Sequence, residues 1–259
     1  MSANAPLPPP PETWLVESLR LTAFPVAPAF EQSHDWWQGV ANGQPETSSE
    51  KRQKQQREDS GPFGGAELAL AVDLLRAQWS AGPIVNPEEL PEGIPNIGPF
   101  VERRTWFRDL MGGWLGECNL EIKRLALGVV LIQPVFDRRT TYERLNQYLR
   151  RVDLNLDCTE FLLRFNRLQP TRTHVAGLNI NTLTTWSGLK VSIAQFAVAL
   201  GNPGITQAAM GVPMHACRLE FDINTDGEYP GPLPQAELQN LWGEFADLAL
   251  EVATRGDEA

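Results

Sequence analysis

The chain has 259 residues, of which 42% are hydrophobic and 21% are charged, a composition typical of a globular protein with one large domain. Its formal net charge of −10 argues against non-specific binding to nucleic acid or to an anionic membrane. No signal-peptide pattern and no apolar run of spanning length is present, so we expect no membrane association and a cytoplasmic location. Three cysteines without CxxC spacing predict a reducing compartment and no disulfide framework.

The distribution of proline and polar residues predicts the domain organisation. Residues 1–12 hold five prolines and should form a disordered tail. A single domain is expected over 13–254, followed by an exposed tail at 255–259. Within the domain, the stretch 44–64 is predicted to be a mobile polar loop, because residues 48–61 include no apolar side chain.

The first half of the domain is expected to contain strands and two helices. Residues 13–24 are rich in strand-forming residues, and 30–43 could form a short helix. Residues 66–79 are ambiguous between helix and strand, and we predict a strand. Prolines recur over 83–99 and predict an irregular crossing. Residues 100–117 place apolar side chains at helical spacing and predict an amphipathic helix.

The second half gives the clearest strand predictions. Residues 124–135 are apolar at both parities, as in a strand buried on both faces. A helix is expected over 140–151 and an alternating strand over 160–168. Residues 216–225 alternate cleanly between apolar and polar side chains, and 234–253 carry a continuous apolar stripe that predicts the last helix.

Between these elements we expect a hairpin and a loop. Residues 177–186 and 188–198 read as two strands joined by a turn at Ser187–Gly188, and 201–213 read as a loop rich in glycine and proline.

The resulting fold class is α+β, with an antiparallel sheet packed against a few long amphipathic helices. No regular alternation of strands and helices indicates a parallel sheet. A strand–linker–helix unit recurs at 13–43, 124–151 and 216–253, which raises the prospect of two strand–helix halves, although residue identity between the units is too low to establish a duplication.

Several short motifs occur in an order that resembles a known family. A first strand ends in Phe24-Pro25, a helix carries Thr105-Trp106-Phe107-Arg108, and a strand contains Arg124-Leu125-Ala126-Leu127-Gly128. A later strand, Asp222-Ile223-Asn224-Thr225, leads to a long helix with a late Phe245. In this order the chain resembles a sporadically distributed bacterial family of unknown function, and the strand prediction for 66–79 follows that order.

The resemblance implies an accessory protein of a bacterial antiphage-defence or mobile-element locus, and it implies no catalytic residue. The chain departs from the family pattern after its Arg-x-x-Leu-Gly strand. The family usually continues with Tyr-Ile-Asn, whereas this chain has Val130-Leu131-Ile132-Gln133. A polar position of the family is therefore apolar or shifted here.

The middle of the chain is basic although the protein is acidic. Residues 101–175 carry 13 basic and 9 acidic side chains. These arginines either pair with carboxylates inside the fold or form an anion-binding face, since arginine recognises phosphate and carboxylate bidentately. A predicted helix start at Thr140 would add backbone donors. The anion-binding candidates are Arg138, Arg139, Arg144, Arg150 and Arg151.

Eight tryptophans are many for this length, and most lie on predicted apolar stripes. Trp36 and Trp37 are adjacent and should not both be buried on one helix face. We therefore predict that one of them contacts a protein partner, because tryptophan is enriched at binding hot spots.

Two patterns suggest metal chemistry only weakly. Asp222, Asn224 and Asp226 followed by Gly227 match the first half of a calcium-binding loop, but Leu233 stands where a bidentate glutamate is needed. His215 and Cys217 share one strand face, but no second pair of zinc ligands accompanies them. No cofactor is expected.

Together these features predict a non-enzymatic binding or accessory protein that contacts a protein partner, with self-association left open. The alternative is a nucleic-acid or nucleotide-phosphate binder that uses the arginines of 138–172. No GxSxG, GxGxxG or P-loop motif is present. An enzyme with a dispersed active site stays open as a third interpretation.

Overall fold

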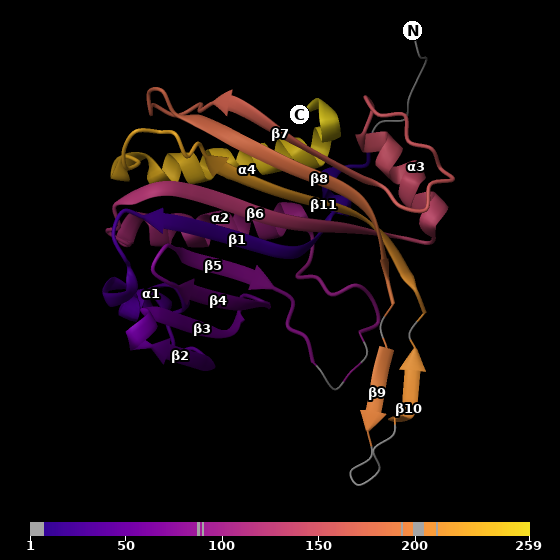
Figure 1. Ribbon diagram of the computed structural model, residues 1–259, viewed down its shortest axis with the longest axis horizontal. Coiled ribbons are helices and arrows are strands. Elements are labelled where there is room, and N and C mark those ends of the chain that lie inside the picture. Colours follow the sequence, from indigo (N-terminus) through magenta and orange to yellow (C-terminus); the bar gives the residue numbers. More distant parts are fainter. Residues whose placement is uncertain (1–7, 87–88, 90, 193, 199–204, 211) are drawn as a thin grey trace.

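The computed structural model describes residues 8–86, 89, 91–192, 194–198, 205–210 and 212–259. In this part of the chain, nine antiparallel strands form one sheet and four helices pack against it, which confirms the predicted α+β class (Figure 1). The strand order is β2-β3-β4-β5-β1-β6-β11-β8-β7. The strands are β1 Leu15–Pro25, β2 Thr47–Lys51, β3 Gln56–Phe63, β4 Ala66–Val72, β5 Ala77–Gly82, β6 Ile122–Val135, β7 Leu162–Pro170, β8 Asn179–Val191 and β11 Met214–Thr225. The helices are α1 Trp36–Ala41, α2 Phe100–Glu117, α3 Arg138–Tyr148 and α4 Leu238–Arg255.

The connectivity of the sheet repeats once along the chain. In the first half, β1 leads to α1, then to the meander β2–β5, and then to α2. In the second half, β6 leads to α3, then to β7, β8 and β11, and then to α4. β1 and β6 pair at the centre of the sheet, and each meander runs inward from an edge to a centre strand. The chain is thus built from two strand–helix halves rather than from three shorter units.

A two-stranded extension leaves the second half. β9 (Ala194–Val198) and β10 (Ile205–Met210) pair antiparallel beyond the ends of β8 and β11 (Figure 1). The sequence interpretation ends the second hairpin strand at residue 198 and treats 201–213 as a loop. The strand β10 corrects that loop prediction over 205–210, and residues 199–204 and 211 lie outside the described residues.

The core lies between the sheet and the long helices. β4 alternates strictly, with Ala66, Leu68, Leu70 and Val72 buried toward the helices. α2 and α4 each have 18 residues and lie behind the sheet in Figure 1. They also pack on each other, and the Trp242 indole donates a hydrogen bond to the Arg108 carbonyl at 3.1 Å. A sheet covered on one face needs this alternation of buried and exposed side chains.

The other face of the sheet is covered by no described helix, and polar pairs cross its central strands. Arg20 on β1 lies 3.5 Å from Asp222 on β11, and Arg218 lies 3.3 Å from Glu17. At one end, the irregular segment before α2 crosses this face and packs Ile94 against Ile132 and Ala216. The predicted burial of the 124–135 strand on both faces therefore holds where this segment covers it.

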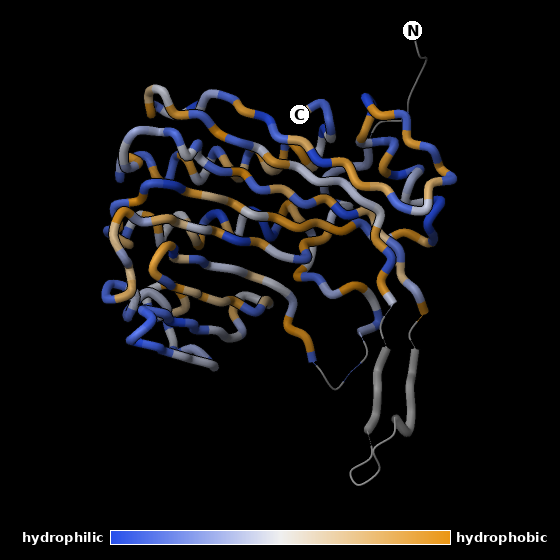
Figure 2. The backbone as a smooth tube through the Cα atoms, in the orientation of Figure 1, coloured by the Kyte–Doolittle hydropathy of each residue, from blue (hydrophilic) through white to orange (hydrophobic). Residues whose placement is uncertain are grey.

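The predicted mobile loop at 44–64 is wrong. Residues 47–51 and 56–63 are the strands β2 and β3, which form one edge of the sheet. Figure 2 shows this edge as predominantly hydrophilic. Every residue of β2 is exposed, and the buried side of β3 carries Asp59 rather than an apolar residue. A search for apolar alternation finds no strand in such a segment.

The predicted turn at Ser187–Gly188 is also wrong, because β8 runs straight through both residues. Gly188 lies opposite Cys217 of β11 in the ladder. A Cβ atom at Gly188 would lie 3.0 Å from Tyr142 Cε1 and 3.3 Å from Thr141 Cγ2. The glycine therefore serves the close approach of α3 to the strand and not a change of chain direction.

The last residues are packed rather than exposed. Gly256 and Asp257 are buried, in contrast to the tail predicted for 255–259. The Asp257 carboxylate accepts hydrogen bonds from the backbone N–H groups of Arg150 and Arg151 at 3.1 and 2.8 Å. Arg167 on β7 donates to the main-chain carbonyl of Asp257. A carboxylate that accepts two backbone N–H groups just after α3 anchors this segment, and no apolar pattern in the sequence signals it.

Candidate functional site

The two adjacent tryptophans of α1 are both buried, because they contact the core from two different sides of the helix rather than from one face. Trp36 is 8% exposed and Trp37 is 3% exposed. The Trp36 ring meets Trp114 of α2 edge-on at 5.2 Å, and the Trp37 ring stacks on Trp79 of β5 at 6.0 Å. The short helix therefore contacts α2 through Trp36 and β5 through Trp37.

Trp36 nevertheless lines a surface groove between α1 and α2. The groove has a volume of about 360 Å³. Trp36 and Trp114 form its floor, and the half-buried Val40 and Leu110 contribute apolar walls. Gly39 on α1 and Gly113 on α2 also line it. We refer to this feature as the α1–α2 groove.

Carboxylates surround the α1–α2 groove. Asp35, Asp109 and Glu117 line it, and all three residues are exposed. Asp109 forms an ion pair with Arg108 at 2.8 Å. Asp35 and Glu117 form no ion pair with another described residue. The groove therefore combines an aromatic floor with a negative rim on which Asp35 and Glu117 have no counter-ion among the described residues.

The five candidate arginines do not converge on one site. Arg139 forms an ion pair with Glu143 one turn along α3 at 3.0 Å. Arg150 and Arg151 follow the C-terminal end of α3. Arg150 forms an ion pair with Glu258 at 3.5 Å, and the Arg151 backbone N–H donates to Asp257. Arg144 lies on the same helix and is half-buried. Of the five, Arg138 lines a cavity.

That cavity lies where α3 meets the ends of β8 and β11. It has a volume of about 420 Å³. α3 contributes Arg138 to its lining, β8 contributes Lys190, and β11 contributes His215. Lys190 and His215 are direct cross-strand partners. The remaining lining comes from Thr141, Tyr142, Thr159, Gly188 and Leu189. We refer to this feature as the α3 cavity.

Sequence reasoning missed two of the three basic side chains of the α3 cavity. Lys190 and His215 are far from Arg138 along the chain, and only the pairing of β8 with β11 brings them together. The available signal was His215 two residues before Cys217, which we interpreted as a weak zinc pair. The two do share a strand, but Cys217 is fully buried and donates from its thiol to the Thr141 carbonyl.

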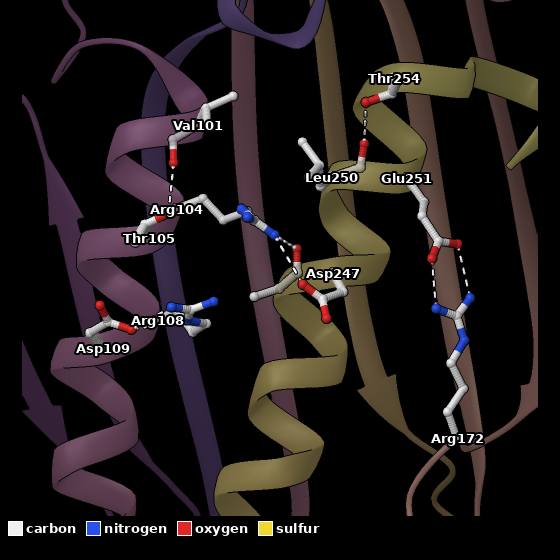
Figure 3. A network of polar contacts seen from close by, with 11 residues as sticks. Val101, Arg104, Thr105, Arg108, Asp109, Arg172, Asp247, Leu250, Glu251 and Thr254 are labelled. Carbon is white, nitrogen blue, oxygen red and sulfur yellow. Dashed lines mark hydrogen bonds and ion pairs between the residues drawn. The ribbon is translucent and has the colours of Figure 1, made fainter.

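Most other arginines of the basic middle segment are paired inside the fold. Arg104 of α2 donates to the Ala246 carbonyl at 3.0 Å. It also donates to Asp247 of α4 at 3.2 Å, as Figure 3 shows. Figure 3 also shows Arg172 bound bidentately by Glu251, at 2.6 and 2.9 Å. These contacts support intramolecular pairing between the basic middle and the acidic C-terminal third, which was the first of the two interpretations.

The pair Arg172–Glu251 predicts a pH dependence of stability. Its hydrogen bond holds the pKa of Glu251 below the ordinary value of 4.5. A carboxyl whose pKa is lowered by folding stabilises the protein above its unfolded pKa, and that contribution is lost as the pH falls through the folded pKa. We expect Glu251→Gln to lower the urea midpoint at pH 7 and to have progressively less effect below about pH 4.5.

The matched control for this titration is Glu102→Gln on the exposed face of α2. Glu102 forms no ion pair with another described residue, so its replacement should leave the urea midpoint nearly unchanged at both pH values. A destabilisation by Glu251→Gln that is as large in acid as at neutral pH would contradict the ionic origin of the effect.

The side chains of the weak calcium motif form hydrogen bonds within the protein. Asn224 donates to Asp222 at 2.6 Å and accepts from Arg124 at 2.7 Å. Asp226 accepts the Glu228 N–H at 3.1 Å in a local turn. Among the described residues, no group of three or more His, Cys, Asp or Glu side chains is arranged to hold a metal ion.

The two buried cysteines, Cys118 and Cys217, are poor candidates for nucleophiles. Burial raises the pKa of the Cys217 thiol to about 12, and burial also raises the pKa of the Cys118 thiol. Thiols with raised pKa values stay protonated and weakly reactive at neutral pH.

No protein-family model, no curated protein and no solved structure matches the chain. Among the helices in the described part of the chain, none is long and apolar enough to cross a membrane.

Proposed function

We propose that the protein is a non-enzymatic binding protein that holds a basic segment of a protein partner in the α1–α2 groove. The observation that carries the proposal is the pairing of an aromatic floor, Trp36 and Trp114, with the carboxylates of the rim. Aromatic floors accept apolar anchor residues, and tryptophan concentrates binding energy at protein interfaces.

The charge of the groove selects the chemistry of the partner. Asp35 and Glu117 have no cationic neighbour within ion-pair distance in the described chain, and the whole protein carries a net charge of −10. A partner segment with lysine or arginine beside an apolar anchor would complement both the rim and the floor. Complementary charge raises the association rate and disfavours acidic competitors.

Two glycine substitutions test the groove without disturbing the core. A Cβ atom at Gly113 or at Gly243 would have no neighbour within 4 Å, and both residues lie in long helices. Gly113 lines the groove, whereas Gly243 of α4 does not. Replacing either glycine by leucine favours the helix by about 1 kcal/mol, so both variants should fold. Gly113→Leu should weaken the binding of the partner at least about tenfold, because its side chain fills the groove.

The measurement is cross-linking in the native host followed by mapping of the bound segment, with wild-type protein and with both leucine variants. The proposal expects a segment that carries Lys or Arg beside an apolar residue, lost with Gly113→Leu and retained with Gly243→Leu. Equal retention by both variants, an acidic mapped segment, or no cross-linked protein at all would contradict it.

The resemblance described above extends this proposal to the setting of the protein. It supports a cytoplasmic accessory protein of a bacterial defence or mobile-element locus. Such a component acts through the partner that it binds, and the identity of that partner in the cross-linking experiment tests the setting as well.

A further inference from the structure

Three basic side chains from three different elements surround the α3 cavity. Arg138 comes from the first turn of α3, Lys190 from β8 and His215 from β11. None of the three forms an ion pair with another described residue. The neighbouring Arg139 behaves differently, since it is held by Glu143 at 3.0 Å. A protein with 32 acidic side chains has ample means to pair its cations, so an unpaired set around a cavity points to an external anion.

Two carboxylates lie near the cavity, but neither forms an ion pair with Arg138, Lys190 or His215. Asp137 is close enough to His215 to interact with it electrostatically, but it caps α3 by accepting the Thr140 N–H at 2.8 Å. Glu160 is likewise close enough to Tyr142 to interact with it electrostatically. Neither carboxylate lines the cavity. Arg138 and Lys190 therefore give the lining a positive charge.

We infer that the α3 cavity binds the phosphate group of a small organic phosphomonoester. Cationic groups that approach from a helix and from two adjacent strands suit a tetrahedral dianion, which accepts hydrogen bonds in several directions, better than a planar carboxylate. Thr159 adds a hydroxyl to the lining.

The shape of the cavity indicates an organic ligand rather than a free ion. Its volume of about 420 Å³ lies in the range of small-molecule sites, about 300–1,000 Å³. Tyr142 contributes aromatic surface beside the basic groups, whereas the Leu189 side chain packs toward Ile132 on the other face of the sheet. Gly188 sets the width of this region, because a Cβ atom at that position would crowd the side chains of Tyr142 and Thr141 on α3. The organic part of the ligand would lie against Tyr142.

The same geometry argues against an extended nucleic-acid face. A nucleic-acid strand needs cationic side chains along a surface, and the arginines that the sequence offered for this role are separated. Arg139 and Arg150 are paired with Glu143 and Glu258. Arg144 and Arg151 do not line the cavity, so the compact basic cluster consists of Arg138, Lys190 and His215, and it fits one phosphate group.

The test is isothermal titration of the full-length protein with phenyl phosphate, with inorganic phosphate and phenol as comparison probes. We expect one saturable site for phenyl phosphate, weaker binding of inorganic phosphate, and no binding of phenol. Arg138→Gln and Lys190→Gln should each weaken the binding of phenyl phosphate at least about tenfold, because each removes a charged hydrogen-bond donor. Both residues are exposed, so both variants should fold.

Arg139→Gln is the matched control. It removes the same charge from the residue next to Arg138, and the Arg139 side chain does not line the cavity. It should change the affinity by less than about twofold. Equal losses with Arg138→Gln and Arg139→Gln would show general electrostatic attraction and overturn the inference. Absence of saturable binding, or tight salt-dependent binding of a single-stranded oligonucleotide without binding of phenyl phosphate, would also overturn it.

Discussion

Replacing Asp59 by alanine is expected to lower the free energy of unfolding by about 3–5 kcal/mol. The Asp59 side chain is fully buried and accepts a hydrogen bond from Arg57 Nε at 2.6 Å, and the Arg57 side chain is only 13% exposed. Ser48 of β2 donates to the same carboxylate at 2.6 Å. Removing the carboxylate leaves a largely buried guanidinium without its counter-ion and removes the side-chain hydrogen bond that Ser48 of β2 makes to β3.

Urea denaturation of single and double variants measures this effect. Asp59→Ala should be strongly destabilised, whereas the double variant Arg57→Met with Asp59→Leu should regain much of the loss, because it buries no unpaired charge. Arg52→Ala provides a control from the exposed pair Arg52–Glu50 and should leave the midpoint nearly unchanged. A small effect of Asp59→Ala, similar to that of Arg52→Ala, would show that the carboxylate is dispensable for the β2–β3 edge.

The same pair explains why this edge of the sheet is absent from the prediction. Hydrophobic periodicity identifies a strand when one face is apolar. The buried positions of β3 are instead Asp59 and Gly61, and every residue of β2 is exposed. Polar edge strands are common because they resist pairing with other chains, but their sequence resembles that of a loop. A buried ion pair carries no periodic signal.

Elements with an apolar stripe were predicted well. Residues 100–117 match α2 at both ends, and 216–225 lie within β11 with Leu219 and Phe221 inward as expected. Gly188 shows the opposite case. A serine–glycine pair between two alternating segments is typical of a turn, yet here the glycine eases the close packing of a helix that is distant along the chain. Local sequence does not distinguish these two uses of glycine.

The candidate sites were predictable only in part, for a related reason. Arg138 was identified from the local charge, and Trp36 from composition, and each lines a cavity. Their partners Lys190, His215 and Trp114 reach these cavities through strand pairing and helix packing. A site assembled from separate elements becomes visible only when the topology is known.

Gly256→Ala is expected to destabilise the protein by at least about 3 kcal/mol. Gly256 has φ +62° and ψ −129°, a region of backbone conformation that is open almost only to glycine. A Cβ atom there would lie 2.0 Å from the Tyr148 carbonyl oxygen at the end of α3. The backbone would have to move away, and with it Asp257, whose carboxylate binds the N–H groups of Arg150 and Arg151.

Gly177→Ala separates the steric effect from the conformational one. Gly177 also has a positive φ, +76°, but a Cβ atom there would meet nothing within 4 Å, so its replacement should cost only about 1 kcal/mol. Thermal and urea unfolding of the two variants should therefore differ clearly. Amide hydrogen exchange should show faster exchange of Arg150 and Arg151 in Gly256→Ala and not in Gly177→Ala, because only the former displaces their acceptor. Equal destabilisation of the two variants would mean that the contact of the chain end with α3 contributes little, and that the positive φ alone accounts for the loss.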